Sequence, residues 1–288
     1  MATFGFIGTG NMGGALAKAV SKSVDAGNIM LANRTRSKAE KLAAEIGCKV
    51  CENADVCWSD FIFLGVKPNM IEGVLNEISD DLLERNTPAV LVSMAAAVTL
   101  EKLLSYMNAP YPIVRIMPNT PASVGEGVIL YTANEYVSEN ALKELIDALS
   151  KAGTCVKIEE KLMDAAGAVS GCGPAFVDLF RESLADGGVA CGLPRNIATI
   201  LAAQTVLGSA KLLLESGKNP GLLKDEVCSP GGTTIEGVRA LEEAGFRGAA
   251  MDAVIAAYEK TLELANKKYY QCSAYNKLSI SFILASYV

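Results

Sequence analysis

The feature that most constrains the fold is a glycine pattern near the N-terminus. Gly8-Thr9-Gly10-Asn11-Met12-Gly13 follows an apolar run at Thr3–Ile7 and precedes a helical segment at Asn11–Ser21. In this context the first glycine makes a tight turn, the second admits a pyrophosphate, and the third lets the helix pack on the strand. The pattern predicts a Rossmann-type domain that binds a dinucleotide through Gly8, Gly10, Asn11, Met12 and Gly13.

Short apolar runs alternate with helical segments through residues 1–160, which is the rhythm of βαβ units. Phe61–Val66 is almost wholly apolar, as a central parallel strand buried on both faces should be. Ser37-Lys38-Ala39-Glu40 has the spacing of a capping box and predicts a helix start. We predict an α/β domain with a doubly wound parallel sheet, whose strands are Thr3–Ile7, Ile29–Ala32, Phe61–Val66, Ala89–Ser93, Ile113–Met117, Gly127–Tyr131 and Thr154–Ile158.

Beyond Lys161 the sequence changes to long segments rich in alanine and leucine. Residues 161–270 are predicted to form an all-helical second domain, and residues 271–288 form a tail of unassigned role. Apolar residues on more than one helix face indicate burial in an oligomer. The expected helices are Pro174–Cys191, Arg195–Glu215, Thr233–Glu243 and Ala249–Lys268.

Composition narrows the class of protein. The chain has 288 residues, a net charge of −6 and no basic tract, so we expect no nucleic-acid partner. No uninterrupted apolar run reaches the ~18–20 residues that span a bilayer, so no membrane partner is expected. The N-terminus has no signal-peptide layout, which predicts a cytoplasmic protein.

Eight cysteines and the lack of any histidine limit the chemistry. Cys48 and Cys51 have C-x-x-C spacing but no second pair, so we predict that they flank a short strand and that the chain holds no metal. Without an imidazole base, catalysis must use hydroxyls, carboxylates, lysine, backbone dipoles or a cofactor.

The residues after the second strand indicate which nucleotide binds. NAD-binding folds place an acid there for the ribose hydroxyls, but this chain has Asn33-Arg34-Thr35-Arg36-Ser37. An acid would repel a 2′-phosphate, whereas arginine and hydroxyl groups bind it with charge-assisted hydrogen bonds. We therefore predict NADP(H), with NADH as an alternative donor.

Two later strand ends should also contact the cofactor, because ligands of open α/β sheets lie at the carboxyl ends of the strands. One is Val66-Lys67-Pro68. The other is Ser93-Met94-Ala95-Ala96, whose small residues leave space for the nicotinamide half.

A second glycine-rich segment, Cys228–Gly237, begins a predicted helix. Its proline, adjacent glycines and threonines can bring backbone N–H groups and hydroxyls close to a ligand. A helix start with unpaired N–H groups suits a carboxylate. A capped helix after a tight turn remains the alternative interpretation.

Together these motifs resemble the Δ1-pyrroline-5-carboxylate reductase family from about Met1 to Leu264. The motifs together are specific for this family, although Gly8–Gly13 alone is not. They comprise Gly8–Gly13, Val66–Pro68, Met117–Pro121, Ser170–Ala175, Leu184–Gly188, Gly192–Arg195 and Ser229–Thr234.

The resemblance implies reduction of the cyclic imine 1-pyrroline-5-carboxylate to L-proline with NAD(P)H. It implies a helical dimerisation and substrate domain through which dimers intertwine, with larger rings such as a decamer, and a partner subunit that contributes to the substrate site. The implied further cofactor contacts are Asn33, Arg34, Thr35, Asn53, Val66, Lys67, Pro68, Ala95 and Ala96. The implied substrate contacts are Glu160, Ser229, Gly231, Gly232, Thr233 and Thr234.

Three positions depart from the common family pattern. Cys172 stands where many members have serine, Phe176 replaces a frequent tyrosine, and Glu226 replaces an asparagine that reaches the cofactor in some members. These departures leave the reaction unchanged and alter the side-chain contacts expected at those positions.

The chemistry expected of this site is mainly positioning, because a protonated imine is already a strong electrophile. We expect the Thr234 hydroxyl to hydrogen-bond the ring nitrogen as the catalytic contact, with solvent as the final proton source. Lys67 is expected to contact a phosphate or the ribose, with a role as general acid as the alternative. Two alternatives remain: a β-hydroxyacid dehydrogenase using a helical-domain lysine, Lys211 or Lys224, and a non-enzymatic NADP(H)-sensing protein.

Overall fold

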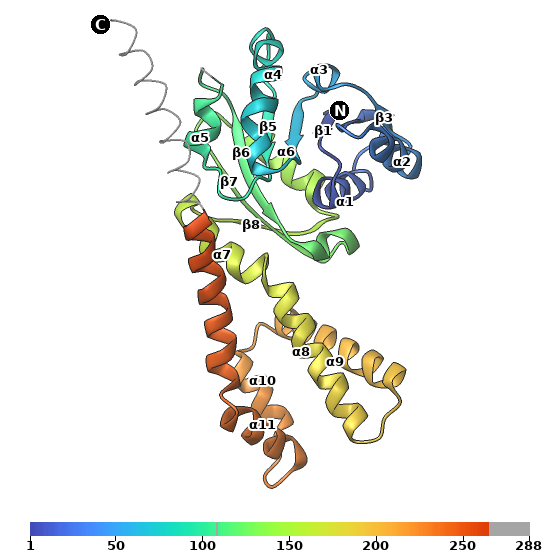
Figure 1. Cartoon of the computed structure of the whole chain (residues 1–288), viewed down its shortest axis with the longest axis vertical. Coiled ribbons are helices and arrows are strands. Elements are labelled where there is room, and N and C mark those ends of the chain that lie inside the picture. Colours follow the sequence, from blue (N-terminus) through green and yellow to red (C-terminus); the bar gives the residue numbers. More distant parts are fainter. Residues whose placement is uncertain (108, 265–288) are drawn as a thin grey trace, which may run out of the picture. The chain divides into compact units, whose positions relative to one another are not determined.

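The computed structural model describes residues 1–107 and 109–264 and divides into two compact units (Figure 1). The first comprises Met1–Gly171 with the described residues from 258 on, and the second comprises Cys172–Ala257. The domain boundary expected after residue 160 falls before the helix Met163–Ser170, which this division keeps with the first unit. The tail at 271–288 lies outside the described residues.

A sheet in the order β3-β2-β1-β4-β5-β6-β7-β8 forms the first unit. Its strands are β1 (Phe4–Ile7), β2 (Ile29–Ala32), β3 (Lys49–Val50), β4 (Phe61–Leu64), β5 (Val90–Ser93), β6 (Ile113–Pro118), β7 (Gly127–Ala133) and β8 (Gly153–Lys157). The order confirms the Rossmann-type fold class. The short β3 lies between Cys48 and Cys51, as the sequence predicts.

One neighbouring pair of strands departs from the predicted parallel arrangement. β6 and β7 are antiparallel, with Val114 opposite Ala133. They are joined through the short 3-10 helix η3 (Thr120–Val124), and a parallel crossover needs about a dozen residues or more. The apolar runs alone did not reveal that this connection is too short.

Helices cover both faces of the sheet, and alternate strand residues divide between two cores. The helices of this unit are α1 (Asn11–Val20), α2 (Arg36–Ile46), α3 (Asn53–Val56), α4 (Ile71–Leu83), α5 (Leu100–Ser105), α6 (Glu139–Leu149) and α7 (Met163–Ser170), with 3-10 turns η1 (Ala26–Asn28), η2 (Pro68–Met70) and η4 (Glu160–Leu162). Phe61 and Phe63 pack with α1, α2 and α6, whereas Ile62 and Leu64 pack with α3, α4 and α5.

The start of α2 corrects one local prediction. The helix begins at Arg36, with Thr35 at its N-cap and no side-chain cap, so the capping box expected at Ser37 is wrong. Glu40 does not reach back to the backbone; its carboxylate pairs with Arg36, one turn earlier, at 3.1 Å. This (i, i+4) ion pair engages the Glu40 carboxylate, which in a capping box would accept a hydrogen bond from the backbone.

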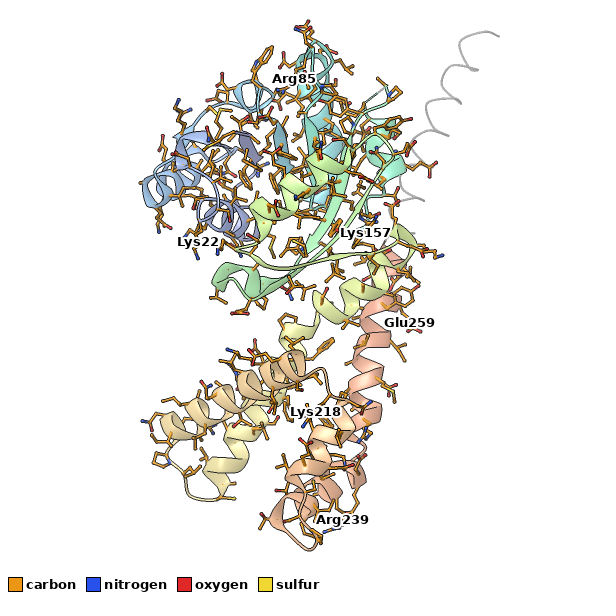
Figure 2. The ribbon with its side chains drawn as sticks, turned by 180° about the vertical axis from the view of Figure 1, so that it is seen from behind. Lys22, Arg85, Lys157, Lys218, Arg239 and Glu259 are labelled. Carbon is orange, nitrogen blue, oxygen red and sulfur yellow. The ribbon has the colours of Figure 1, made fainter. Side chains whose placement is uncertain are left out.

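Polar side chains also fix the loops between these elements. Arg85, labelled in Figure 2, follows α4 and donates to the carbonyl oxygens of Cys57 at 2.5 Å and Thr87 at 3.0 Å. Its guanidinium thereby pairs carbonyl groups that the neighbouring loops leave unsatisfied.

The second unit is helical, as predicted. Its helices are α8 (Gly173–Ala190), α9 (Arg195–Ser216), α10 (Pro220–Val227) and α11 (Thr233–Glu243). A further helix begins at residue 246 and is described to 264, and its residues from 258 on belong to the first unit. Small side chains, Ala185, Ala198 and Ala202, let α8 and α9 pack closely.

Helix α9 exposes a row of apolar side chains at seven-residue spacing. Ile200, Leu207 and Leu214 are 63%, 56% and 83% exposed. Among the described helices, α9 alone has the length and mean hydropathy that a bilayer crossing needs, which is also typical of a helix buried between subunits.

Candidate functional site

The glycine loop lies at an edge of the sheet where four strands end. Ile7 is in register with Ala32 of β2 and Leu64 of β4, and Leu64 with Ser93 of β5. The carboxyl ends of these parallel strands therefore form one edge, and every predicted cofactor residue except Asn53 follows one of them.

Close backbone approach explains two of the loop glycines. Gly8 has φ +97°, and a Cβ there would lie 2.7 Å from the carbonyl group of Gly65. A Cβ on Gly13 would lie 2.2 Å from the Gly8 carbonyl oxygen. Gly65, which the sequence analysis did not single out, is constrained by the same oxygen at 2.4 Å. Its position directly before Val66, a predicted cofactor contact, could have identified Gly65 from the sequence.

Gly10, by contrast, faces open space: no atom lies within 4 Å of where its Cβ would be. It is the N-cap of α1, which has no side-chain cap and no acidic residue in its first turn. The hydroxyl of Thr9 is buried and has no hydrogen-bond partner among the described residues. An uncapped helix start beside an open glycine and an unpaired hydroxyl fits a pyrophosphate.

The residues after β2 form a second part of this edge. Asn33 accepts from the Thr9 N–H at 2.9 Å and donates to the Thr35 carbonyl at 2.9 Å, so it links the glycine loop to the β2–α2 loop. Arg36 is occupied by Glu40 and by Glu52, at 3.1 and 2.7 Å.

Arg34 differs from its neighbour Arg36. Its side chain is exposed and has no hydrogen bond or ion pair with any described residue. Of the two arginines after β2, Arg34 therefore has the guanidinium that is available to an added phosphate.

The remaining predicted cofactor residues flank this edge. Val66 lies against the first glycine, since a Cβ on Gly8 would be 2.9 Å from its Cγ1. Lys67 is exposed and caps η2, in which Pro68 is the first residue. Asn53 begins α3, where its amide donates to Glu77 at 3.0 Å.

A short turn, residues 94–99, connects β5 to α5 and carries Ala95 and Ala96. The Ala95 N–H donates to the buried Ser93 hydroxyl at 3.3 Å. Ala97 has φ +57°, the one left-handed non-glycine residue among residues 1–107 and 109–264. Such strain persists only where the surroundings hold it, and it is concentrated at functional sites.

Glu160 is already committed to partners within the first unit. Its Oε1 accepts from the Leu100 N–H at 2.7 Å and pairs with Arg115 at 3.3 Å. Arg115 is only 3% exposed and also pairs with Asp164 at 3.3 Å. The sequence analysis missed Arg115 and Asp164, although an arginine within the apolar run Ile113–Met117 was a visible signal.

The second unit carries the other glycine-rich segment. Ser229, Pro230, Gly231 and Gly232 form a β-turn, closed by the Gly232 N–H donating to the Ser229 carbonyl at 3.0 Å. Proline second and glycine third, with φ +67° at Gly231, are typical of a type II turn. A Cβ on Gly232 would lie 2.3 Å from the Ser229 hydroxyl, so the turn packs tightly.

This turn leads directly into α11, whose N-cap Gly232 provides no side-chain cap. The hydroxyls of Ser229, Thr233 and Thr234 make no hydrogen bond with the described residues, and all three residues are exposed. The first N–H groups of the helix and three hydroxyls are therefore gathered on one short segment. A carboxylate fits such a segment.

The lysines of the second unit do not resemble an acid/base lysine. Lys224 donates a hydrogen bond to the Asp225 carboxylate, which raises the pKa of Lys224 and keeps its amine protonated at neutral pH. Lys211 pairs with Glu215 at 3.7 Å on an exposed helix face. Glu226, one of the three departures from the family pattern, accepts a hydrogen bond from Lys218 at 2.7 Å. Lys218 is labelled in Figure 2.

The cysteine pair shows no sign of reactivity. Burial raises the pKa of both Cys48 and Cys51 to about 11, so both thiols stay protonated at neutral pH. In residues 1–107 and 109–264, no group of three or more histidine, cysteine, aspartate or glutamate side chains is arranged to hold a metal ion.

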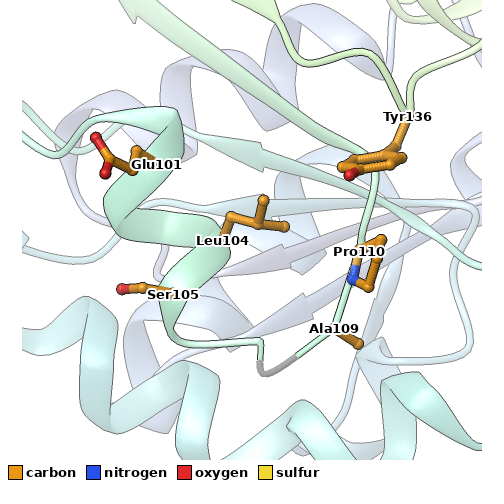
Figure 3. Close-up of a pocket in the computed structure, with 6 residues that line it drawn as sticks. All are labelled: Glu101, Leu104, Ser105, Ala109, Pro110 and Tyr136. Atoms are coloured by element: carbon orange, nitrogen blue, oxygen red, sulfur yellow. The ribbon is translucent and has the colours of Figure 1, made fainter.

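Figure 3 shows a shallow, mainly apolar hollow elsewhere on the first unit. It is lined by α5 residues such as Leu104 and by Pro110 and Tyr136. None of the predicted site residues lines it, so it contributes nothing to the cofactor edge.

Comparison with known proteins identifies two family models along the chain. Residues 160–264 match the model described as pyrroline-5-carboxylate reductase dimerisation. Residues 3–97 match the model described as NADP oxidoreductase, coenzyme F420-dependent. The first covers α9, and the second covers the glycine loop and residues 94–97 of the turn after β5.

Curated relatives match over nearly the whole chain. Pyrroline-5-carboxylate reductase of Escherichia coli is 41% identical over 265 residues, covering 91% of this chain and 97% of the relative. Pyrroline-5-carboxylate reductase 3 of Danio rerio is 40% identical over 267 residues, covering 92% of each chain.

Solved structures that resemble this chain include further pyrroline carboxylate reductases. The pyrroline carboxylate reductase of Plasmodium falciparum with NADP bound superimposes with a TM-score of 0.80 at 34% identity, covering 92% of this chain and 98% of that one. The reductase of Coxiella burnetii gives a TM-score of 0.85 at 31% identity, covering 91% and 98%.

Proposed function

The chain belongs to the pyrroline-5-carboxylate reductase family, and we propose that it reduces 1-pyrroline-5-carboxylate to L-proline with NADPH. The observation that carries the proposal is the 41% identity over 91% of the chain. The family models matched by residues 3–97 and 160–264 include the glycine loop and the Ser229–Thr234 segment. This activity makes the protein an oxidoreductase of proline biosynthesis.

The first unit would hold the cofactor. When bound, NADPH supplies the hydride for reduction. The α1 start at Gly10 would hold the pyrophosphate, and Arg34 would pair with the 2′-phosphate. The further proposed contacts are Gly8, Asn11, Met12, Gly13, Asn33, Thr35, Asn53, Val66, Lys67, Pro68, Ala95 and Ala96. NADH would lose the Arg34 contact, so it would serve as the weaker donor.

The Ser229–Thr234 segment would bind the substrate carboxylate. The uncapped N–H groups of α11 and the hydroxyls of Ser229 and Thr233 support this assignment. Gly231 and Gly232 let the backbone approach the ligand, and the Thr234 hydroxyl would hydrogen-bond the ring nitrogen. The resemblance adds Glu160 to the substrate contacts.

The residues would act by positioning rather than by strong acid catalysis. Threonine is a poor proton donor, so the Thr234 hydroxyl would orient the ring nitrogen while solvent supplies the proton that ends on the product amine. An acid/base lysine, as in a β-hydroxyacid dehydrogenase, finds no support, since both Lys211 and Lys224 pair with carboxylates.

One assay separates the proposed activity from both alternatives. NADPH oxidation is followed with pyrroline-5-carboxylate, and NADP⁺ reduction with a 3-hydroxyacid is measured beside it. We expect turnover only with the imine. Turnover only with the hydroxyacid would favour the dehydrogenase, and cofactor binding without turnover would favour the sensing protein.

We further propose a cytoplasmic enzyme that works as an intertwined dimer, with decamers as a larger assembly and no membrane or nucleic-acid partner. The match of residues 160–264 to a dimerisation model and the apolar row on α9 support the dimer.

A further inference from the structure

We propose that Arg115 and Glu160 are positioning residues that hold the β5–α5 turn, residues 94–99, in the geometry required for hydride transfer. The inference rests on the proposed function, because it takes the nicotinamide half of the cofactor to lie against Ala95 and Ala96.

Hydrogen bonds hold the turn at both of its ends. At its start, the Ala95 N–H donates to the Ser93 hydroxyl at 3.3 Å, and both residues are buried. At its end, the Leu100 N–H donates to the Glu160 carboxylate at 2.7 Å. Leu100 is the first residue of α5, so its N–H has no partner within the helix, and a carboxylate there is also favoured by the helix dipole.

The backbone conformation in the middle of the turn explains why the hydrogen bonds at both ends are needed. Ala97 has φ +57°, a conformation that costs an alanine free energy and is kept only when its surroundings leave no alternative. If the hydrogen bond at Leu100 were lost, the turn could relax to an ordinary conformation. Ala95 and Ala96 would then move with it.

Arg115 in turn fixes Glu160. Arg115 is 3% exposed, and its guanidinium lies between the carboxylates of Glu160 and Asp164, at 3.3 Å from each. A buried planar guanidinium sets the direction of its partners more rigidly than a lysine could. Glu160 thus connects β6 to the start of α5, whereas Asp164 makes the same ion pair but has no bond to the turn.

This difference provides a matched pair of variants. Glu160→Ala and Asp164→Ala each remove one partner of Arg115, but only the first frees the Leu100 N–H. At saturating NADPH and pyrroline-5-carboxylate we expect Glu160→Ala to lower kcat about tenfold or more, and Asp164→Ala to stay within about twofold of wild type. Glu160→Gln should recover most of the loss, because its amide oxygen can still accept from Leu100.

The kinetic outcomes distinguish positioning from other roles. An equal fall of kcat in both alanine variants would mean that the ion pairs only stabilise the fold. A raised KM for pyrroline-5-carboxylate with unchanged kcat in Glu160→Ala would mean that Glu160 acts only by contacting the substrate and not through the turn. Either result would overturn the proposal.

Amide hydrogen exchange on the ligand-free protein tests the geometry without any turnover. We expect faster exchange at residues 95–100 in Glu160→Ala than in wild type, and unchanged exchange there in Asp164→Ala. Unchanged exchange in both would overturn the positioning role. A wild-type protein that fails to reduce the imine would overturn the proposed function instead, and the exchange result would still report on the turn.

Discussion

At the scale of single residues, Arg34 and Arg36 show how neighbours of the same type acquire different roles. The guanidinium of Arg36 is paired with two carboxylates, and that of Arg34 with none among the described residues. The charge expected to select NADPH is therefore that of Arg34.

Arg34→Ala should weaken NADPH binding about 10- to 100-fold, because one charge-assisted contact with the 2′-phosphate is worth about 1.5–3 kcal/mol. NADH, which lacks that phosphate, should bind within about threefold of wild type. Fluorescence titration with both cofactors measures the two values. Arg36→Ala is the matched control and should change NADPH affinity much less. Equal losses for NADPH and NADH in Arg34→Ala would contradict the assignment.

Thr234→Ala should lower kcat/KM for pyrroline-5-carboxylate about 5- to 150-fold, which corresponds to about 1–3 kcal/mol for one hydrogen bond made in the transition state. Thr234→Ser keeps the hydroxyl and should retain most activity. NADPH affinity should stay within about threefold in both variants. Steady-state kinetics and a cofactor titration provide the measurements. Full activity of the alanine variant would show that the backbone N–H groups and solvent suffice.

At the scale of elements, the Ser229–Gly232 turn depends on backbone conformation more than on side chains. Gly231 has φ +67°, where an alanine costs about 1 kcal/mol, and nothing crowds its Cβ position. Conformation is therefore the only cost of adding a methyl group there.

Gly231→Ala should raise KM for the imine about fivefold, because about 1 kcal/mol of strain lowers the population of the binding conformation by that factor. Gly237→Ala, in the interior of α11 and equally uncrowded, is the matched control. It should leave KM unchanged and stabilise the helix by up to about 1 kcal/mol. Kinetics and thermal melting of both variants test this, and a raised KM in the control alone would refute it.

At the scale of the whole molecule, the apolar row on α9 should lie in the interface between subunits. Light scattering of the wild type should give at least twice the monomer mass. Leu207→Glu should shift the protein towards monomer, because a buried unpaired carboxylate is strongly unfavourable. Leu83→Glu, which changes an exposed leucine of α4 outside the dimerisation region, should leave the mass unchanged. A wild-type monomer would contradict the proposed dimer.

Stability should fall in alkaline solution because burial raises the pKa of the Cys57 thiol to about 12 and that of Cys155 to about 11, from an ordinary value of 9.0. Above pH ~9 the unfolded chain releases these protons while the folded chain retains them, so the free energy of unfolding decreases until the pH reaches about 11–12. From about pH 8 to about pH 10, Cys57 should account for about 1 kcal/mol. Urea unfolding of wild type and Cys57→Ala measures this, and equal pH slopes would contradict it.

Sequence by itself determined much of the fold and of the cofactor edge. The spacing of Gly8, Gly10 and Gly13 requires a strand, a tight turn and a helix, because a side chain would collide with the backbone at the first and third of these positions. The apolar runs located the strands because parallel strands are buried on both faces. Local patterns of this kind depend on residues that are close together in the chain.

Only the tertiary structure decided which side chains are already paired. Arg115 and Glu160 meet although 45 positions separate them, and Leu100 and Glu160 although 60 do. The ion pair between Arg36 and Glu52, which helps to distinguish Arg36 from Arg34, was equally invisible in the sequence. Ion pairs and hydrogen bonds depend on distances in space, and a linear pattern sets those distances only within one element.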